Sequence, residues 1–230
     1  VMNYPFRDAV LGFLTGCRAT DFFNKILDVV ENYPPQVLRL LMNHIGTHDT
    51  ERALTFLEDE PVGSHDRTWQ DGRRLSPEKY NQGIQLMSMA YALLYTLPGV
   101  PCIYYGDEAG MEGYEDPYNR RTFPWGGEDR ALTEGFAALG QHRKRSAPLR
   151  EGVLRWGTCA GSVLSFAREK DGRSAGVAVN RGAEPALAEL PWKGAAALEL
   201  NTGRRYLAVD GVLRVKVPSM EALRLESAEV

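Results

Sequence analysis

The spacing of hydrophobic and polar positions changes near residue 150. Before it, apolar runs that suit strands alternate with longer segments whose apolar residues recur at helical spacing. After it, short segments alternate apolar and polar residues, with turn residues roughly every 8 to 12 positions. The pattern predicts β/α units over residues 1–149 and an all-β antiparallel sandwich over residues 150–230.

Within the first part, the apolar runs predict strands over residues 1–6, 37–48 and 100–106. The helical spacing of phenylalanine, isoleucine, leucine and valine over residues 19–34 predicts a helix that Thr20 or Asp21 caps. A second helix is predicted from Ser76 as N-cap, with Pro77 at its first position, to Pro98-Gly99. A third covers roughly residues 132–146.

In the second part, five segments show the clearest alternation. They are VLRWGT (153–158), SVLSFARE (162–169), SAGVAVN (174–180), ALELN (197–201) and GVLRVKVP (211–218). Together they predict the strands of the sandwich.

Composition and charge restrict the classes of molecule that the chain is expected to bind. The 230 residues carry a net charge of −3, with a pI near 5.9, which gives no electrostatic reason to expect nucleic acid or an anionic membrane as partner. No apolar stretch approaches the ~18 residues of a membrane helix, and no secretory signal opens the chain. Three scattered cysteines indicate free thiols, so we expect a cytoplasmic protein.

Ionisable residues follow two of the predicted strands directly. His48 and Asp49 end one strand, and Asp107 and Glu108 follow another. Ligands of parallel β/α folds bind at the carboxyl ends of strands, so both pairs are candidate site residues. Asp also ends strands merely because it forms turns, which leaves a structural interpretation open, more so for Asp107 and Glu108.

His44, His48, Asp49 and His65 have side chains that zinc accepts as ligands. On an extended strand, however, residues 44 and 48 would lie about 13 Å apart, at ~3.3 Å per residue. They could not chelate one ion, so the sequence predicts no metal ligands and no cofactor.

A third polar cluster, EGYEDPYNRRTFPW, covers residues 112–125. Asp116 can accept hydrogen bonds from two sugar hydroxyls, and Arg120 offers a fixed fork of donors. A solvated loop held by salt bridges is the competing interpretation.

These clusters, in this order, resemble glycoside hydrolase family 13, the α-amylase family, and its neopullulanase, cyclomaltodextrinase and maltogenic-amylase branch above all. GTHDTER (46–52) resembles the signature that closes barrel strand seven. LPGVPCIYYGDEAGMEGYEDPYNRRTFPW (97–125) is similar to the strand-eight segment and its loop, and FAALGQHRKRSAPLREG (136–152) to the last barrel helix.

The resemblance implies the last part of a (β/α)8 TIM barrel, about strands six to eight, followed by the C-terminal sandwich. It implies retaining cleavage of α-glucosidic bonds in maltooligosaccharides, cyclomaltodextrins or pullulan. Asp49 matches the transition-state-stabilising carboxylate, His48 the imidazole on the same sugar ring, and Asp116 and Arg120 substrate-binding positions. The family's nucleophile Asp and acid/base Glu belong to signatures that this sequence lacks, so the isolated chain is expected to be inactive.

Two alternatives to a hydrolase stay open. A non-catalytic relative could keep the fold as a carbohydrate-binding or interaction module, and a transglycosylase would use the same residues. Three β/α units also leave barrel edges unpaired, so we expect self-association through them.

Overall fold

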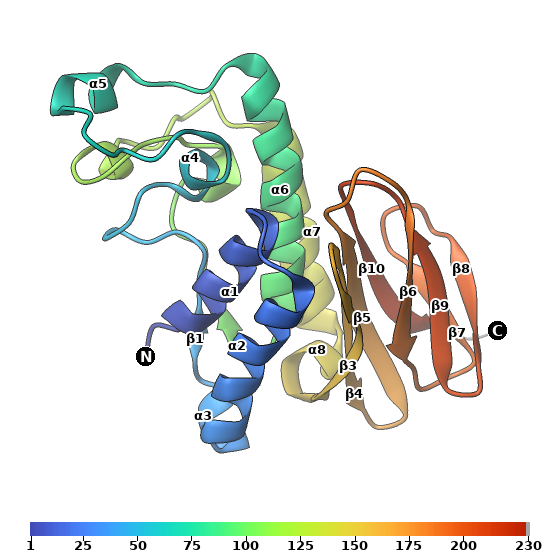
Figure 1. The fold of residues 1–230 in the computed structure, drawn as a ribbon. Coiled ribbons are helices and arrows are strands. Elements are labelled where there is room, and N and C mark those ends of the chain that lie inside the picture. Colours follow the sequence, from blue (N-terminus) through green and yellow to red (C-terminus); the bar gives the residue numbers. More distant parts are fainter. Residues whose placement is uncertain (229–230) are drawn as a thin grey trace.

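The computed structural model describes residues 1–228, with short strands and helices first and a β-domain after them (Figure 1). The helices are α1 (Tyr4–Leu14), α2 (Ala19–Asn32), α3 (Pro35–Leu38), α4 (Ala53–Glu58), α5 (Arg67–Gly72), α6 (Pro77–Thr96), α7 (Arg130–Arg145) and α8 (Ala147–Glu151). Two 3-10 turns, η1 (Asp107–Ala109) and η2 (Tyr118–Arg120), lie between α6 and α7. The expected domain boundary at 149/150 falls within α8 and stays a prediction.

Three short extended segments of the first part run parallel. β1 (Met42–Asn43) pairs with β2 (Val100–Pro101), and Met2 bridges Met42 on the other side of β1. The strands predicted over 1–6, 37–48 and 100–106 are therefore wrong in extent. The first of them gives way to α1, because Pro5 suits a first helical turn and buried residues recur from Phe6 at helical spacing.

Two of the predicted helices, α6 and α2, occur where the sequence placed them. The Ser76 hydroxyl accepts a hydrogen bond from the Lys79 amide at 3.3 Å, which caps α6 as predicted. In α2 the predicted N-cap is wrong, since Arg18 holds that position. Asp21 instead lies in the first turn, where its carboxylate accepts from the Arg18 amide at 3.0 Å.

The β-domain is one antiparallel sheet in the order β3-β4-β5-β10-β7-β8-β9-β6. Its strands are β3 (Val153–Ala160), β4 (Val163–Lys170), β5 (Arg173–Asn180), β6 (Ala186–Pro191), β7 (Ala196–Glu199), β8 (Arg205–Val209), β9 (Val212–Val217) and β10 (Glu221–Ala228). The five predicted strands are confirmed, and β6, β8 and β10 were not among them. The sheet is nearly closed, because the Glu189 amide of β6 donates to the Thr158 hydroxyl of β3 at 2.9 Å.

The helices and the β-domain share a hydrophobic core. Phe166 and Val177 of the sheet are fully buried in the same cluster as Phe22 and the inner face of α6. Phe22 stacks on Phe166 with ring centroids 6.4 Å apart. A second cluster lies inside the sheet around Trp192. Burial of this kind is the main stabilising contribution, so the two parts support each other.

A buried arginine reinforces this junction. Arg168 of β4 donates to the Thr96 carbonyl at the end of α6 at 3.0 Å and to the Gly152 carbonyl at 2.7 Å. A cation is favourable at the carboxyl end of a helix, where carbonyls lack intrahelical donors. Burial lowers the pKa of the Arg168 guanidinium to about 9, so most of its charge persists at neutral pH.

Candidate functional site

The loop after β1 presents His48 and Asp49 to solvent. The His48 Nε2 atom lies 3.1 Å from Asp49 Oδ1, and both side chains are about half exposed. The Tyr4 hydroxyl donates to the other oxygen of Asp49 at 3.5 Å, and the Asp49 amide donates to the Thr47 hydroxyl at 3.2 Å. The carboxylate therefore keeps lone pairs free for an incoming donor.

The loop between η1 and α7 lies against this pair. Arg120 donates from Nε to the His48 carbonyl at 3.1 Å, and the same atom lies 3.5 Å from the Asp116 carboxylate. Asn119 donates to the carbonyls of His48 at 3.0 Å and Thr50 at 2.7 Å. The structure thus brings His48 and Asp49 together with Asp116 and Arg120, about 70 positions later in the sequence.

A buried network lies beneath the loop, and Asp107 is its one member that the sequence marked as a candidate site residue. Arg52 is fully buried, with its guanidinium 3.4 Å from the Asp107 carboxylate and over the rings of Tyr104 and Tyr105. The Tyr91 hydroxyl donates to the other Asp107 oxygen at 2.6 Å. Burial raises the pKa of Asp107 to about 6, partly offset by these two donors.

This network explains why glycine stands at position 46. A Cβ on Gly46 would lie 2.5 Å from the Asp107 carboxylate, so the backbone before His48 rests directly on that group. These contacts favour the structural interpretation that the sequence left open for Asp107. Its sequence signal was the same as that of Asp49, namely an acid at a strand end, and only burial separates the two.

His44 is also buried, and it lies apart from His48. Its ring meets the Tyr4 ring edge-on at 4.7 Å, while burial and the nearby Arg7 cation lower its pKa to about 4. Arg7 itself donates to the Ile45 carbonyl at 2.8 Å. Within residues 1–228 no group of three or more His, Cys, Asp or Glu side chains is placed to hold a metal ion.

The exposed groups suit hydrogen bonding to a polyhydroxyl ligand. Asp49 and Asp116 supply acceptors, and His48 and Arg120 supply donors, on one surface of two adjoining loops. The loop of residues 59–75 adjoins them, because Arg67 donates to the Asp116 carbonyl and Arg121 donates to Asp71 at 2.9 Å. These contacts hold the loop that carries Asp116 and Arg120 in place.

Comparison with known proteins assigns the chain to a family. The model of the alpha amylase catalytic domain matches residues 1–152. The chain belongs to the alpha-amylase family. The sequence resemblance is thereby confirmed.

Curated members of the alpha-amylase family align over almost the whole chain. An amylopullulanase of Thermoanaerobacter thermohydrosulfuricus is 32% identical over 99% of this chain and 17% of its own length. A cyclomaltodextrinase of Geobacillus thermopakistaniensis is 30% identical over 95% of this chain and 34% of its own length. A neopullulanase 2 of Thermoactinomyces vulgaris is 30% identical over 98% of this chain and 36% of its own length. The chain thus spans between a sixth and about a third of these relatives.

Solved structures match the fold over both parts. A cyclomaltodextrinase structure superposes with a TM-score of 0.79 at 25% identity, over 99% of this chain and 36% of that one. An Anoxybacillus alpha-amylase, at 20% identity, superposes with the same TM-score of 0.79 over 100% of this chain and 47% of that one. The β-domain therefore corresponds to the β-rich C-terminal domain of family members. Every helix within residues 1–228 is too short or too polar to span a lipid bilayer.

Proposed function

We propose that this chain is the C-terminal portion of an α-glucan hydrolase that cleaves α-1,4 or α-1,6 glucosidic bonds with retention. The observation that carries the proposal is the contact of the His48–Asp49 loop with Asp116 and Arg120, in a family member whose relatives bear the names cyclomaltodextrinase, neopullulanase and amylopullulanase. The substrates we propose are maltooligosaccharides, cyclomaltodextrins or pullulan.

In this proposal Asp49 stabilises the transition state. The sugar becomes oxocarbenium-like as the glycosidic bond breaks, and a fixed carboxylate favours that positive charge. His48, paired with Asp49 at 3.1 Å, donates to a hydroxyl of the same ring. Asp116 and Arg120 hold a neighbouring sugar unit through hydrogen bonds.

The two carboxyl groups that make and break bonds would come from outside this chain. A retaining enzyme needs a nucleophile and an acid/base about 5 Å apart on opposite sides of the scissile bond. Neither of the family's two signatures for these groups occurs in the sequence. Asp49 is a single carboxylate and cannot serve on both sides, so the 230 residues alone should not hydrolyse glucans.

The three parallel segments at Met2, β1 and β2 would be barrel strands six, seven and eight. Each is followed along the chain by helices, as β/α units require. Asp49 then lies at the carboxyl end of strand seven, the side of the barrel on which β/α loops form active sites.

Hydrolysis assays with two polypeptides test this proposal. The chain and the product of its full reading frame would each be incubated with maltotriose and a cyclomaltodextrin. We expect sugar release only from the longer polypeptide. Asp49→Asn in that polypeptide should lower kcat about 10²–10³-fold, the size typical for loss of one electrostatic stabiliser.

The control is Asp171→Asn, which removes an exposed carboxylate in the β4–β5 turn and should leave kcat unchanged. Sugar release by the 230-residue chain would contradict the placement of the nucleophile and acid/base. A longer polypeptide that binds glucans without cleaving them would instead indicate a non-catalytic carbohydrate-binding relative.

A further inference from the structure

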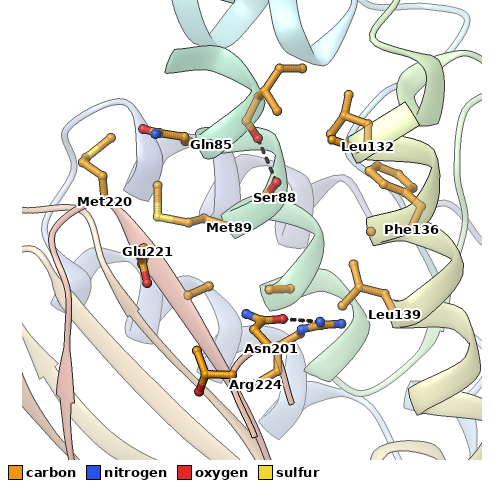
Figure 2. Close-up of a pocket in the computed structure, with 16 residues that line it drawn as sticks. Gln85, Ser88, Met89, Leu132, Phe136, Leu139, Asn201, Met220, Glu221 and Arg224 are labelled. Atoms are coloured by element: carbon orange, nitrogen blue, oxygen red, sulfur yellow. Dashed lines mark hydrogen bonds between the residues drawn. The ribbon is translucent and has the colours of Figure 1, made fainter. Parts of the chain in front are cut away.

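A cleft of about 510 Å³ lies away from the His48–Asp49 loop, where α6 and α7 meet β10 and the turn between β7 and β8 (Figure 2). Its volume falls within the range of small-molecule sites, roughly 300–1,000 Å³. Because its walls come from both the helical part and the β-domain, a bound molecule would contact both.

The body of the cleft is apolar. Met89 of α6 faces Leu132, Phe136 and Leu139 of α7, and all four side chains are at least nine-tenths buried. Met220, before β10, lies on the opposite wall (Figure 2). Methionine side chains adapt their shape, so this wall can fit against ligands of differing shape.

One end of the cleft is polar and contains the Arg224 guanidinium. There the Arg224 guanidinium donates to the Asn201 side-chain oxygen, while Met89, Phe136 and Leu132 lie farther along (Figure 2). Arg224 makes no ion pair with any residue in the range 1–228. Burial lowers the pKa of Arg224, as expected for a cation with no carboxylate within contact distance.

The carboxylates near Arg224 do not neutralise it by contact. Glu199 raises the pKa of Arg224 through space, but its oxygens accept from the Asn201 amide at 2.9 Å and from the Thr202 amide and hydroxyl at 2.8 and 2.6 Å. Glu221 lies on the rim and is exposed to water. An anion seated at Arg224 would gain a charge-assisted hydrogen bond in a partly desolvated place.

We propose that this cleft binds an amphiphilic carboxylate, with the alkyl or aryl body against the partly exposed Ile84, Met220 and Ala222 and the carboxylate on Arg224. The charge at one end and the apolar lining of the rest select this class over a neutral sugar. Phe136 is 5% exposed and presents no open ring face on which a sugar could stack. The proposal is independent of the function proposed above.

Octanoate is the probe, with 1-octanol and maltotriose as neutral comparisons, measured by calorimetric titration of the purified chain. We expect octanoate to bind one site and to raise the melting temperature. Arg224→Gln should weaken octanoate binding about tenfold or more and leave 1-octanol binding unchanged. The matched control Arg214→Gln removes an exposed arginine on β9 and should change neither.

A second pair of variants locates the site. Gly135→Leu places a side chain into the cleft, whereas Gly140→Leu adds the same group to α7 away from it, and neither new Cβ meets an atom within 4 Å. Gly135→Leu should weaken the binding of octanoate and of 1-octanol about tenfold, and Gly140→Leu should leave the binding of both unchanged. Absence of octanoate binding, equal effects of the two variants, or preferential binding of maltotriose would each overturn the proposal.

Discussion

At the scale of single residues, His44 and Asp107 are buried ionisable groups whose pKa values shift in opposite directions. Burial raises the pKa of Asp107 from 3.8 to about 6 and lowers that of His44 from 6.5 to about 4. Between these values the folded state binds the Asp107 proton more tightly than the unfolded state does, and the His44 proton less tightly. The Asp107 contribution to stability is therefore lost as pH rises, and the His44 contribution is gained.

The slopes of unfolding free energy against pH that Asp107 and His44 cause have opposite signs and nearly cancel. Substituting one residue at a time should therefore reveal the slope due to the other. In Asp107→Asn, the unfolding free energy should rise by about 2 kcal/mol between pH 4 and 6.5, because the opposing titration of Asp107 is removed and that of His44 remains. In His44→Gln, it should fall by about 2 kcal/mol between pH 4 and 6. Urea unfolding at several pH values measures both. A common slope for the two variants would contradict this assignment.

At the scale of elements, α6 and α7 each contain glycines at helical positions, with different surroundings. Gly83 is buried where α6 packs on α4, and a Cβ there would lie 2.4 Å from a methyl group of the fully buried Leu54. Gly135 of α7 is exposed, with no atom within 4 Å of an added Cβ. Helix propensity favours alanine over glycine at both positions, but packing permits it at only one.

Gly83→Ala should therefore lower the unfolding free energy by about 1–3 kcal/mol, since overpacking outweighs propensity. Gly135→Ala should raise it by about 0.5–1 kcal/mol. Chemical denaturation of both variants beside the wild type measures the difference. Stabilisation by both substitutions would mean that α4 moves aside at little cost.

At the scale of the whole molecule, apolar side chains beside the short parallel strands are exposed to solvent. Val100 of β2 is 49% exposed and Leu40, just before β1, is 74% exposed. Unpaired strand edges beside exposed apolar side chains favour pairing with another chain. We propose that copies of the isolated chain associate through this edge.

Light scattering over a concentration series should show the mass of the chain rising above that of a monomer. Val100→Lys should shift the mass toward the monomer, because a charged side chain at the edge opposes strand pairing. Leu187→Lys, a matched change at a 72% exposed leucine of the β-domain, should leave it unchanged. A constant monomeric mass for the wild type would contradict the proposal.

The family and part of the order of the elements could be predicted from the sequence alone. Periodicity and caps placed α2, α6 and α7 and five strands of the β-domain, because helix and strand signals are local. It did not identify β10: EALRLESA contains good helix formers, and pairing with β5 and β7 is what makes it a strand. It also overstated the three parallel strands, because apolar runs do not reveal where pairing ends.

The residues of the candidate site could be predicted from the sequence, but their contacts and their burial could not. Motif spacing singled out His48, Asp49, Asp116 and Arg120, yet their contact across two loops depends on long-range folding. Asp49 and Asp107 follow strands in the same way, and only the fold leaves one half exposed and buries the other against Arg52. The physical reason is that burial and hydrogen-bond partners, which set the charge and availability of a side chain, come from residues far away in the chain.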